Sequence, residues 1–459
     1  MAGVGFSLRS LHREDSYSGV LKLYGAAGLI SSGPWLLSIL TLLLIGLLGR
    51  ALVPDPEMLV RFQVSVTWLF AASLILTGPL SLMFTRFVAD RDYAGESDRT
   101  APNLLGALAF TSLFSAAVAA ALSPLFHEQS LFCKLLLGVC LVTLSDIWIA
   151  IVVLTGLRAH DKVLTSFGIG YAVTFGSTLF LARFGEVGLL GGFALGQASL
   201  LFSSLWMILR ALPSDSPAEF GFLRRKSLYL DLGVIGLLYN LGVWVDKWMF
   251  WQDPGVSRAV FGPLRSSEVY DLPIFLGYLT LLPGMAVFLV RVETDFAECH
   301  AAFYAAIRDG APLRRIEQLC NAMTDAARRA VVGIIKVQGV TFVICCVIGP
   351  WLLQLFGLSI LHAPLFYIDA AGVALQVLLL AVTSIFFYLD RRRAVAWLVL
   401  LLVVSNASLT WLSQKLGPEY YGYGFALAMA LTALAGLWRL SRTFSTLVRD
   451  TFMLQPGTP

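Results

Sequence analysis

Long blocks of apolar residues, separated by short polar segments, run through almost the whole chain. A helix of about 20 residues spans the roughly 30 Å apolar core of a bilayer and satisfies its own backbone hydrogen bonds there. About twelve blocks reach this length: Leu23–Leu48, Val64–Phe84, Leu104–Leu125, Leu135–Leu157, Val163–Leu181, Val187–Leu212, Leu228–Trp251, Leu272–Val290, Val331–Phe356, Leu365–Leu389, Ala394–Leu412 and Tyr421–Leu440. The pattern predicts an all-α polytopic membrane protein.

Composition supports this prediction. The 459 residues are 58% hydrophobic and 14% charged, whereas soluble domains carry about 25% charged residues. No segment outside the twelve blocks is long enough to form a sizeable soluble domain. We therefore expect the function to reside within a helix bundle. The first block is too long for the apolar region of a signal peptide, and we interpret it as an uncleaved helix.

The distribution of lysine and arginine predicts the orientation. With the N-terminus in the cytoplasm, roughly 23 of these residues fall in predicted cytoplasmic segments and about 7 on the opposite side. One missed helix would invert every later loop and abolish this bias. The charges thus predict twelve spans with both termini in the cytoplasm.

A weak internal repeat suggests how the helices are grouped. Shifting the chain by about 205 residues aligns short stretches of the two halves, as transporter repeats do; the matched pairs are Leu23-Tyr24 with Leu228-Tyr229, Gly28 with Gly233, Arg86 with Arg291, and Asp90 with Asp295. Chance matching of common residues is the alternative. We predict two parallel six-helix lobes around a central cavity: residues 1–212, a cytoplasmic linker at 213–227, and residues 228–459.

Ionisable groups within the predicted spans are candidate functional residues. Asp146 lies near the middle of its span, where a carboxylate costs about 2.5–3.5 kcal/mol on insertion scales. It should therefore face protein or water, in a substrate pathway, in coupling, or in a structural hydrogen bond. We add Asp231, Asn240, Asp246 and Lys247 of the seventh span to the candidate pathway or coupling residues.

Two of these candidates are neighbours in sequence. Adjacent side chains diverge around a helix, so Asp246 and Lys247 are not expected to pair with each other. We expect Lys247 to extend its ammonium group to the outer surface instead.

Helix-breaking and small residues predict bends and close contacts. Proline removes a backbone donor, so Pro34, Pro79 and Pro283 are predicted to kink their helices. Such kinks fit both a rocking transporter and a static bundle. The glycines at 188, 192 and 196 recur at four-residue spacing, and we interpret them as helix packing.

The longest predicted cytoplasmic loop, 291–330, contains an amphipathic segment. Leu313 and Ile316 begin its apolar face. Such a helix could lie on the membrane surface or dock a partner protein. We keep both interpretations, with Leu313 and Ile316 as candidate docking residues.

Motifs of soluble enzymes are missing from the sequence. No lysine follows a glycine, which excludes a Walker A phosphate loop, and there is no His-Glu-x-x-His zinc motif. We therefore expect a transporter rather than an enzyme, with no metal, cofactor or nucleic-acid partner.

Four stretches resemble a known family: GVGFSLRSL (Gly3–Leu11), YGAAGLISSGPWLLSIL (Tyr24–Leu40), RVETDFAE (Arg291–Glu298) and FYLDRRRA (Phe387–Ala394). Together with the length and the number of spans, they are similar to the Pel exopolysaccharide transport subunit (PelG) family of the multidrug/oligosaccharidyl-lipid/polysaccharide (MOP) flippase superfamily. The resemblance implies a bacterial inner-membrane protein that moves an N-acetylgalactosamine-rich polymer out of the cytoplasm. It also implies two partners, a cytosolic glycosyltransferase and a membrane subunit that senses cyclic di-GMP. It supplies no site motif.

The predicted function is therefore export of an exopolysaccharide or of its lipid-linked precursor. One alternative is a small-molecule antiporter, including the major facilitator type, although the loop Arg86–Asp98 lacks the glycines of that type's signature. Another is a membrane scaffold that recruits a polysaccharide synthase without transporting anything.

Overall fold

The computed structural model describes residues 27–28, 37–53, 55–156, 160–214, 216–224 and 228–453, without the side chains of 160–162. Pro34, the first predicted kink, lies outside these residues. The chain divides into two compact units. We call Gly33–Glu268 the α3–α8 unit, and Met1–Ser32 with Val269–Pro459 the α9–α15 unit, after the helices that they contain.

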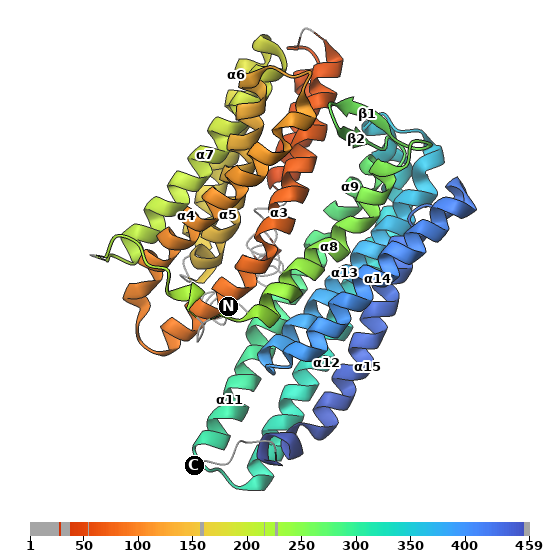
Figure 1. Cartoon of the computed structure of the whole chain (residues 1–459). Helices are drawn as coiled ribbons and strands as arrows, with labels where there is room; N and C mark the ends of the chain where they lie inside the picture. The colour runs from red at the N-terminus through yellow and green to blue at the C-terminus, as the bar shows by residue number, and fades with distance from the viewer. Residues whose placement is uncertain are drawn as a thin grey trace. The chain divides into compact units, whose positions relative to one another are not determined.

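The α3–α8 unit consists of long helices and one small hairpin (Figure 1). Its helices are Leu37–Gly49, α3 (Pro56–Tyr93), α4 (Thr100–Leu122), α5 (Leu131–Gly156), α6 (His160–Leu181), α7 (Gly185–Ala211) and α8 (Leu230–Gln252). The antiparallel hairpin β1 (Arg258–Phe261) and β2 (Leu264–Ser266) follows α8. The predicted division into two six-helix lobes with a linker at 213–227 stays a prediction.

Helix α3 illustrates how local sequence sets the start of these helices. The Asp55 side chain accepts a hydrogen bond from the backbone N–H of Glu57 at 3.0 Å, and Pro56 occupies the first helical turn. Both features are favoured at helix N-termini, because the first N–H groups have no partner within the helix. The helix then continues without interruption through Pro79 to Tyr93.

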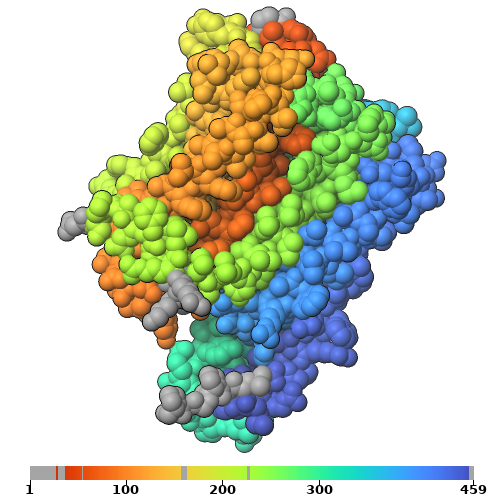
Figure 2. All heavy atoms as spheres, in the orientation of Figure 1, coloured from red at the N-terminus to blue at the C-terminus, as the bar shows by residue number. Residues whose placement is uncertain are grey.

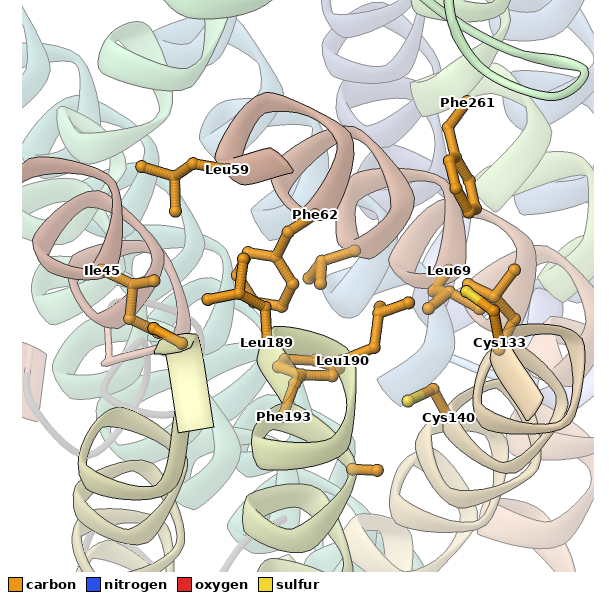
Figure 3. Packing of buried hydrophobic residues seen from close by; sticks show 14 of the residues in the cluster. Ile45, Leu59, Phe62, Leu69, Cys133, Cys140, Leu189, Leu190, Phe193 and Phe261 are labelled. Atoms are coloured by element: carbon orange, nitrogen blue, oxygen red, sulfur yellow. The ribbon is translucent and has the colours of Figure 1, made fainter. Parts of the chain in front are cut away.

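An apolar core holds α3, α5 and α7 together (Figure 3). Phe62 of α3 is fully buried and packs edge-on against Phe193 of α7, with ring centroids 6.1 Å apart. Cys133 and Cys140 of α5 lie in the same cluster as free thiols.

Helices α6 and α7 pack with their backbones unusually close. A Cβ atom on Gly192 would lie 2.4 Å from Thr178 Cα, and one on Gly196 would lie 2.3 Å from Thr174 Cα. The approach also lets the Ser177 hydroxyl donate to the Gly192 carbonyl at 2.7 Å. This confirms the predicted packing role of these glycines, since larger residues would separate the helices.

The α9–α15 unit is also helical (Figure 1). Its elements are α9 (Asp271–Leu279), α10 (Leu281–Val290), a π-helical segment (Arg291–Phe296), α11 (Ala297–Arg308), α12 (Leu313–Leu355), α13 (Ala363–Tyr388), α14 (Arg392–Leu416) and α15 (Tyr423–Met453). Helix α9 ends at Leu279 and α10 begins at Leu281, so the break falls at Thr280. In a continuous helix the N–H of residue 283 would donate to the Leu279 carbonyl. Pro283 has no N–H and cannot make this bond.

The predicted loop at 291–330 is almost entirely helical. It comprises the π-helical segment, α11, a turn at 309–312 and the N-terminal part of α12, and α11 packs against α12 as a hairpin (Figure 1). The predicted amphipathic helix is present and begins at Leu313. Its apolar face is buried from Ile316 onward, where α11, which the sequence did not predict, supplies a second helix to pack against.

In the part of the chain that the structure describes, nine helical segments are long and apolar enough to cross a membrane. Large apolar side chains on their outer faces are exposed, including Leu113 at 75% and Val347 at 76%. Such surfaces are unfavourable in water and suit lipid. Helix α8 is not among the nine, and it carries Asp231, Asp246 and Lys247. The protein is thus multi-pass and helical, and the count of twelve spans stays a prediction.

Candidate functional site

The carboxylate of Asp146 is buried in α5 of the α3–α8 unit. It is 6% exposed, and its Oδ2 accepts a hydrogen bond from Ser112 Oγ of α4 at 2.6 Å. Within the described residues, its Oδ1 has no hydrogen-bond partner. A buried oxygen in this state is costly unless it is protonated or hydrated, so Asp146 is a group that could exchange a proton or bind a polar ligand.

A cavity of about 230 Å³ lies beside this pair, between α3, α4 and α5. Its lining includes Thr111 and Ser145, the chain neighbours of Ser112 and Asp146. Their hydroxyl oxygens are buried without a hydrogen-bond partner in the described structure. A water molecule occupies about 30 Å³ in the liquid, so the cavity has room for several waters that could satisfy these groups.

Asp246 and Lys247 form an ion pair inside α8. Lys247 Nζ lies 3.0 Å from Asp246 Oδ2 and also donates to the Val243 carbonyl at 2.9 Å. The Asp246 side chain is 0% exposed and that of Lys247 is 4% exposed. Two predictions were therefore wrong. Asp246 and Lys247 do pair with each other, and Lys247 does not extend to the outer surface. The four-carbon stem of lysine folds back along the helix, and a buried ammonium requires a counter-charge.

Four tryptophans, one from α3 and three from α8, contact one another in the stretch of α8 that contains this ion pair. The rings of Trp68 (α3) and Trp251 (α8) stack with centroids 4.5 Å apart. Trp248 meets Trp68 edge-on at 6.5 Å, and Trp244 lies 6.2 Å from Trp251. Lys247 Nζ lies 6.0 Å above the Trp244 ring. Trp251 is buried, whereas Trp248 is 44% exposed and presents an aromatic surface. We call these four residues the tryptophan cluster.

Arg265 of β2 fixes the position of the cluster. Its guanidinium donates to the Trp251 carbonyl and to Ser257 Oγ, each at 3.0 Å, and to the Ser257 carbonyl at 2.8 Å. The Arg265 carbonyl in turn accepts from Trp68 Nε1 at 2.8 Å. Arg265 therefore links the β hairpin by hydrogen bonds to both Trp68 and Trp251.

The cluster combines flat apolar faces with hydrogen-bonding groups. Indole rings bury large area with little loss of conformational entropy, and their edges remain able to form hydrogen bonds. Asp246 and Lys247 are buried beside these rings and pair with each other, so they are not part of the exposed surface. The exposed face of Trp248 suits stacking against the C–H face of a ligand. Tryptophans also occur as interface anchors in membrane proteins, which is the purely structural interpretation.

The other two predicted polar residues of this group have separate neighbours. Asn240 donates to the Gly236 carbonyl at 3.0 Å, beside the crossing of α3 and α8. At this crossing a Cβ on Gly236 would lie 2.1 Å from the Gly78 oxygen. Asp231 is exposed in the first turn of α8. Figure 2 shows α3 and α8 in contact along their surface.

A third contact joins α8 to α3 at residues that the internal repeat singled out. Tyr229 Oη donates to Asp90 Oδ2 at 2.5 Å, and Arg86 Nε lies 3.0 Å from Asp90 Oδ1. The matched residues in the other half also form an ion pair, with Arg291 Nη1 2.8 Å from Asp295 Oδ2, but in the π-helical segment rather than in an α-helix. Both are ion pairs at i, i+4 spacing, which is already present in the sequence, so the repeat stays a prediction.

The predicted docking residues differ in accessibility. Leu313 is 57% exposed, whereas Ile316 is 3% exposed and lies on the face of α12 that the chain itself covers. A partner could therefore reach Leu313 directly but not Ile316. Their role in docking stays a prediction.

Several residues of the site were missed by the sequence reasoning. Trp68, Trp248, Trp251, Arg265 and Ser112 were not predicted. A signal was present for part of the set, because Trp244, Trp248 and Trp251 occur together in the stretch WVDKWMFW. The contributions of Trp68 and Arg265 depend on contacts between residues about 200 positions apart, which no local pattern predicts.

Comparison with known families identifies the family of this chain. The model of the family described as "PelG: Putative exopolysaccharide Exporter (EPS-E)" matches residues 1–452. A comparison with curated proteins gives no match.

Solved structures with a similar fold are transporters. An outward-facing multidrug resistance MATE family transporter of the MOP superfamily is 13% identical, with a TM-score of 0.66 over 92% of this chain and 96% of that one. The inward-facing form of a MATE family transporter gives a TM-score of 0.63 at 12% identity, covering 91% and 96%. A MOP superfamily transporter from Pyrococcus furiosus gives 0.63 at 14%, covering 92% and 96%. At these identities the likeness establishes the fold alone.

Proposed function

Since the chain belongs to the PelG family, we propose that it translocates an exopolysaccharide across the bacterial inner membrane. The family match over residues 1–452 carries the proposal, because it spans nearly the whole chain rather than one motif. The transporter fold supports it. Because the protein is multi-pass and helical and its sequence lacks the enzyme motifs considered above, we expect its helix bundle to carry out its function.

We propose that translocation uses two alternating states. Solved structures of this fold include one described as outward-facing and one described as inward-facing. In this protein, two parallel six-helix lobes would move relative to each other to produce the two states. The lobes would contain twelve spans in all, with both termini in the cytoplasm. This arrangement rests on the repeat predicted from sequence, whose matched residues form the ion pairs Arg86–Asp90 and Arg291–Asp295.

The tryptophan cluster is the proposed contact for the polymer. The exposed face of Trp248 would stack on sugar rings, and the Asp246–Lys247 pair, which is buried in the same helix, is a proposed coupling group. Asp146, with its unsatisfied oxygen and the adjoining cavity, is the proposed coupling or pathway group. The cargo is an N-acetylgalactosamine-rich polymer or its lipid-linked precursor.

Two partners complete the proposal. A cytosolic glycosyltransferase would deliver the polymer, and a membrane subunit that senses cyclic di-GMP would control delivery, as in a Pel-like complex. The hairpin of α11 and α12 is the proposed docking element, with the exposed Leu313 at its turn. The buried Ile316 would contribute by holding the hairpin together.

Export of small molecules is the second candidate. The neighbouring structures described as multidrug resistance transporters favour it, since they share the fold over nearly the whole chain. A scaffold for a polysaccharide synthase is a third possibility, supported by the α11–α12 hairpin alone.

Trp248→Ala tests the proposed function. We expect secreted polymer to fall while the amount of protein in the membrane stays constant, with partial recovery in Trp248→Phe. Trp397→Ala is the matched control, because Trp397 is 65% exposed and lies on α14. Normal secretion by Trp248→Ala would exclude the cluster as the sugar contact. Deletion of the gene separates the functions: unchanged polymer secretion with increased drug sensitivity would support the small-molecule transporter.

A further inference from the structure

A groove of about 700 Å³ lies in the α9–α15 unit, between α10 and α12. Its apolar part includes Leu282 and Ala286 of α10, and Val332 and Val337 of α12. Gly28 also lines the groove, and a Cβ placed on it would lie 3.4 Å from Ala286 Cβ. Its floor is narrow, because a Cβ on Gly333 would lie 3.2 Å from Val287 Cγ1. The volume lies within the range of about 300–1,000 Å³ that is typical of sites for small ligands.

Four cationic side chains line the same groove: Arg291, Arg328, Arg329 and Lys336. Arg291 is paired with Asp295 at 2.8 Å. The other three form no ion pair with any described residue, and Asp325, one turn before Arg329, lies beyond ion-pair distance of both arginines. Arg328, Val332 and Lys336 follow at four-residue intervals and share one face of α12. The groove therefore combines an apolar wall with three positive charges that form no ion pair within the described residues.

The groove lies where α12 changes from a polar to a lipid-facing helix. Lys336 is the last charged residue of α12, and residues 337–355 contain no acidic or basic side chain. Beyond it, outward-facing residues such as Val343 (61% exposed) and Trp351 (64% exposed) present an apolar surface. The cations thus sit at the level where lipid headgroups meet the apolar core.

We propose that this groove binds the phosphate headgroup of an anionic membrane phospholipid. Arg328 and Lys336 contact the phosphate, and the apolar side formed by Val332 and Val337 receives the first part of an acyl chain. Basic pockets between membrane helices hold anionic headgroups in this way, and charge complementarity selects them over zwitterionic lipids. The bilayer supplies this ligand laterally, along the exposed face of α12.

The test measures lipid retained by the full-length protein. Protein purified in detergent is supplied with phosphatidylglycerol or phosphatidylcholine, and bound lipid is counted by native mass spectrometry. We expect phosphatidylglycerol to be preferred, and Arg328→Gln with Lys336→Gln to weaken its binding roughly tenfold or more, given that each basic residue near the surface is worth about 1 kcal/mol. The matched control is Arg314→Gln with Arg315→Gln, which removes equal charge from the same helix outside the groove.

Three outcomes would overturn the proposal. Equal loss in the groove variant and in the control would show a general charge effect. Equal retention of phosphatidylcholine would exclude headgroup recognition. Displacement of the lipid by millimolar inorganic phosphate would indicate a site for a soluble anion. All four substituted residues are exposed, so a failure to fold is not expected.

Discussion

The hydroxyl of Tyr388 donates a hydrogen bond to Oε2 of Glu293 at 2.8 Å, joining the end of α13 to the π-helical segment after α10. Glu293 is 2% exposed, and Phe296 packs edge-on against the Tyr388 ring with centroids 5.6 Å apart. The two partners belong to the stretches RVETDFAE and FYLDRRRA, which carried the family resemblance. These stretches therefore form one contact in the fold.

Tyr388→Phe should destabilise the α9–α15 unit. The ring contacts remain, but Glu293 loses its donor, and an unsatisfied buried acceptor costs about 1–3 kcal/mol, more for a charged group. We expect a lower thermal unfolding midpoint in detergent. Thr443→Val is the control, because Thr443 is only partly buried and its hydroxyl donates to the Arg439 carbonyl of its own helix. An unchanged midpoint in Tyr388→Phe would show that the bond contributes nothing to stability.

Asp146→Asn separates a charge-dependent role from a structural one. The amide keeps the volume and can still accept from Ser112, so membrane abundance should stay normal. Polymer export should fall strongly if protonation or charge is needed. Asp146→Leu should reduce abundance as well, since the Ser112 hydroxyl would lose its acceptor. Normal export by Asp146→Asn would leave Asp146 with a packing role alone.

Removal of one member of the Asp246–Lys247 pair should be worse than removal of both. Lys247→Met leaves a buried carboxylate without this counter-charge, a change that typically costs about 3–5 kcal/mol. Lys247→Met with Asp246→Asn removes both charges and should recover much of the protein in the membrane. Abundance measured by immunoblot checks this. A double variant no more abundant than the single would show that the two residues are not energetically coupled. Export by a well-folded double variant would exclude the pair from the substrate pathway.

Gly236→Ala should destabilise the crossing of α3 and α8. The new Cβ would lie 2.1 Å from the Gly78 oxygen, so the helices must separate, at a cost of about 1–3 kcal/mol. Gly339→Ala is the matched control on α12, where nothing lies within 4 Å. It should be neutral or stabilising by up to about 1 kcal/mol, because alanine is the better helix former. Equal unfolding midpoints for the two variants would contradict the close crossing.

Labelling of introduced cysteines tests the orientation. In a variant without the native cysteines, Glu268→Cys should react with an impermeant maleimide in intact spheroplasts. Arg393→Cys should react only after lysis. Both positions are exposed, whereas Ser266 in the same outer segment is buried and unsuitable. Reaction at position 393 in intact cells would invert the predicted topology.

Much of the helical fold could be predicted from sequence, because transmembrane length and hydropathy are local properties. The amphipathic helix at Leu313 and the packing glycines of α7 followed from spacing. The α11–α12 hairpin did not, since the moderately polar α11 has no membrane-length apolar run.

The site was less predictable than the fold. The polarity of α8 marked Asp246 and Lys247 as notable, but the rule for adjacent residues failed because it ignores the reach of a long side chain. The tryptophan cluster needs Trp68 from α3 and Arg265 from β2, whose positions depend on tertiary contacts.

Helices α3 and α8 are joined at three levels: Trp68 with Trp251, Gly78 with Gly236, and Asp90 with Tyr229. Because the two antiparallel helices are in contact near both ends and at mid-length, neither can slide or tilt independently of the other. They are expected to move as one rigid pair. A displacement of α8 at Trp251 is therefore coupled through both helices to Tyr229, at the opposite end of α8.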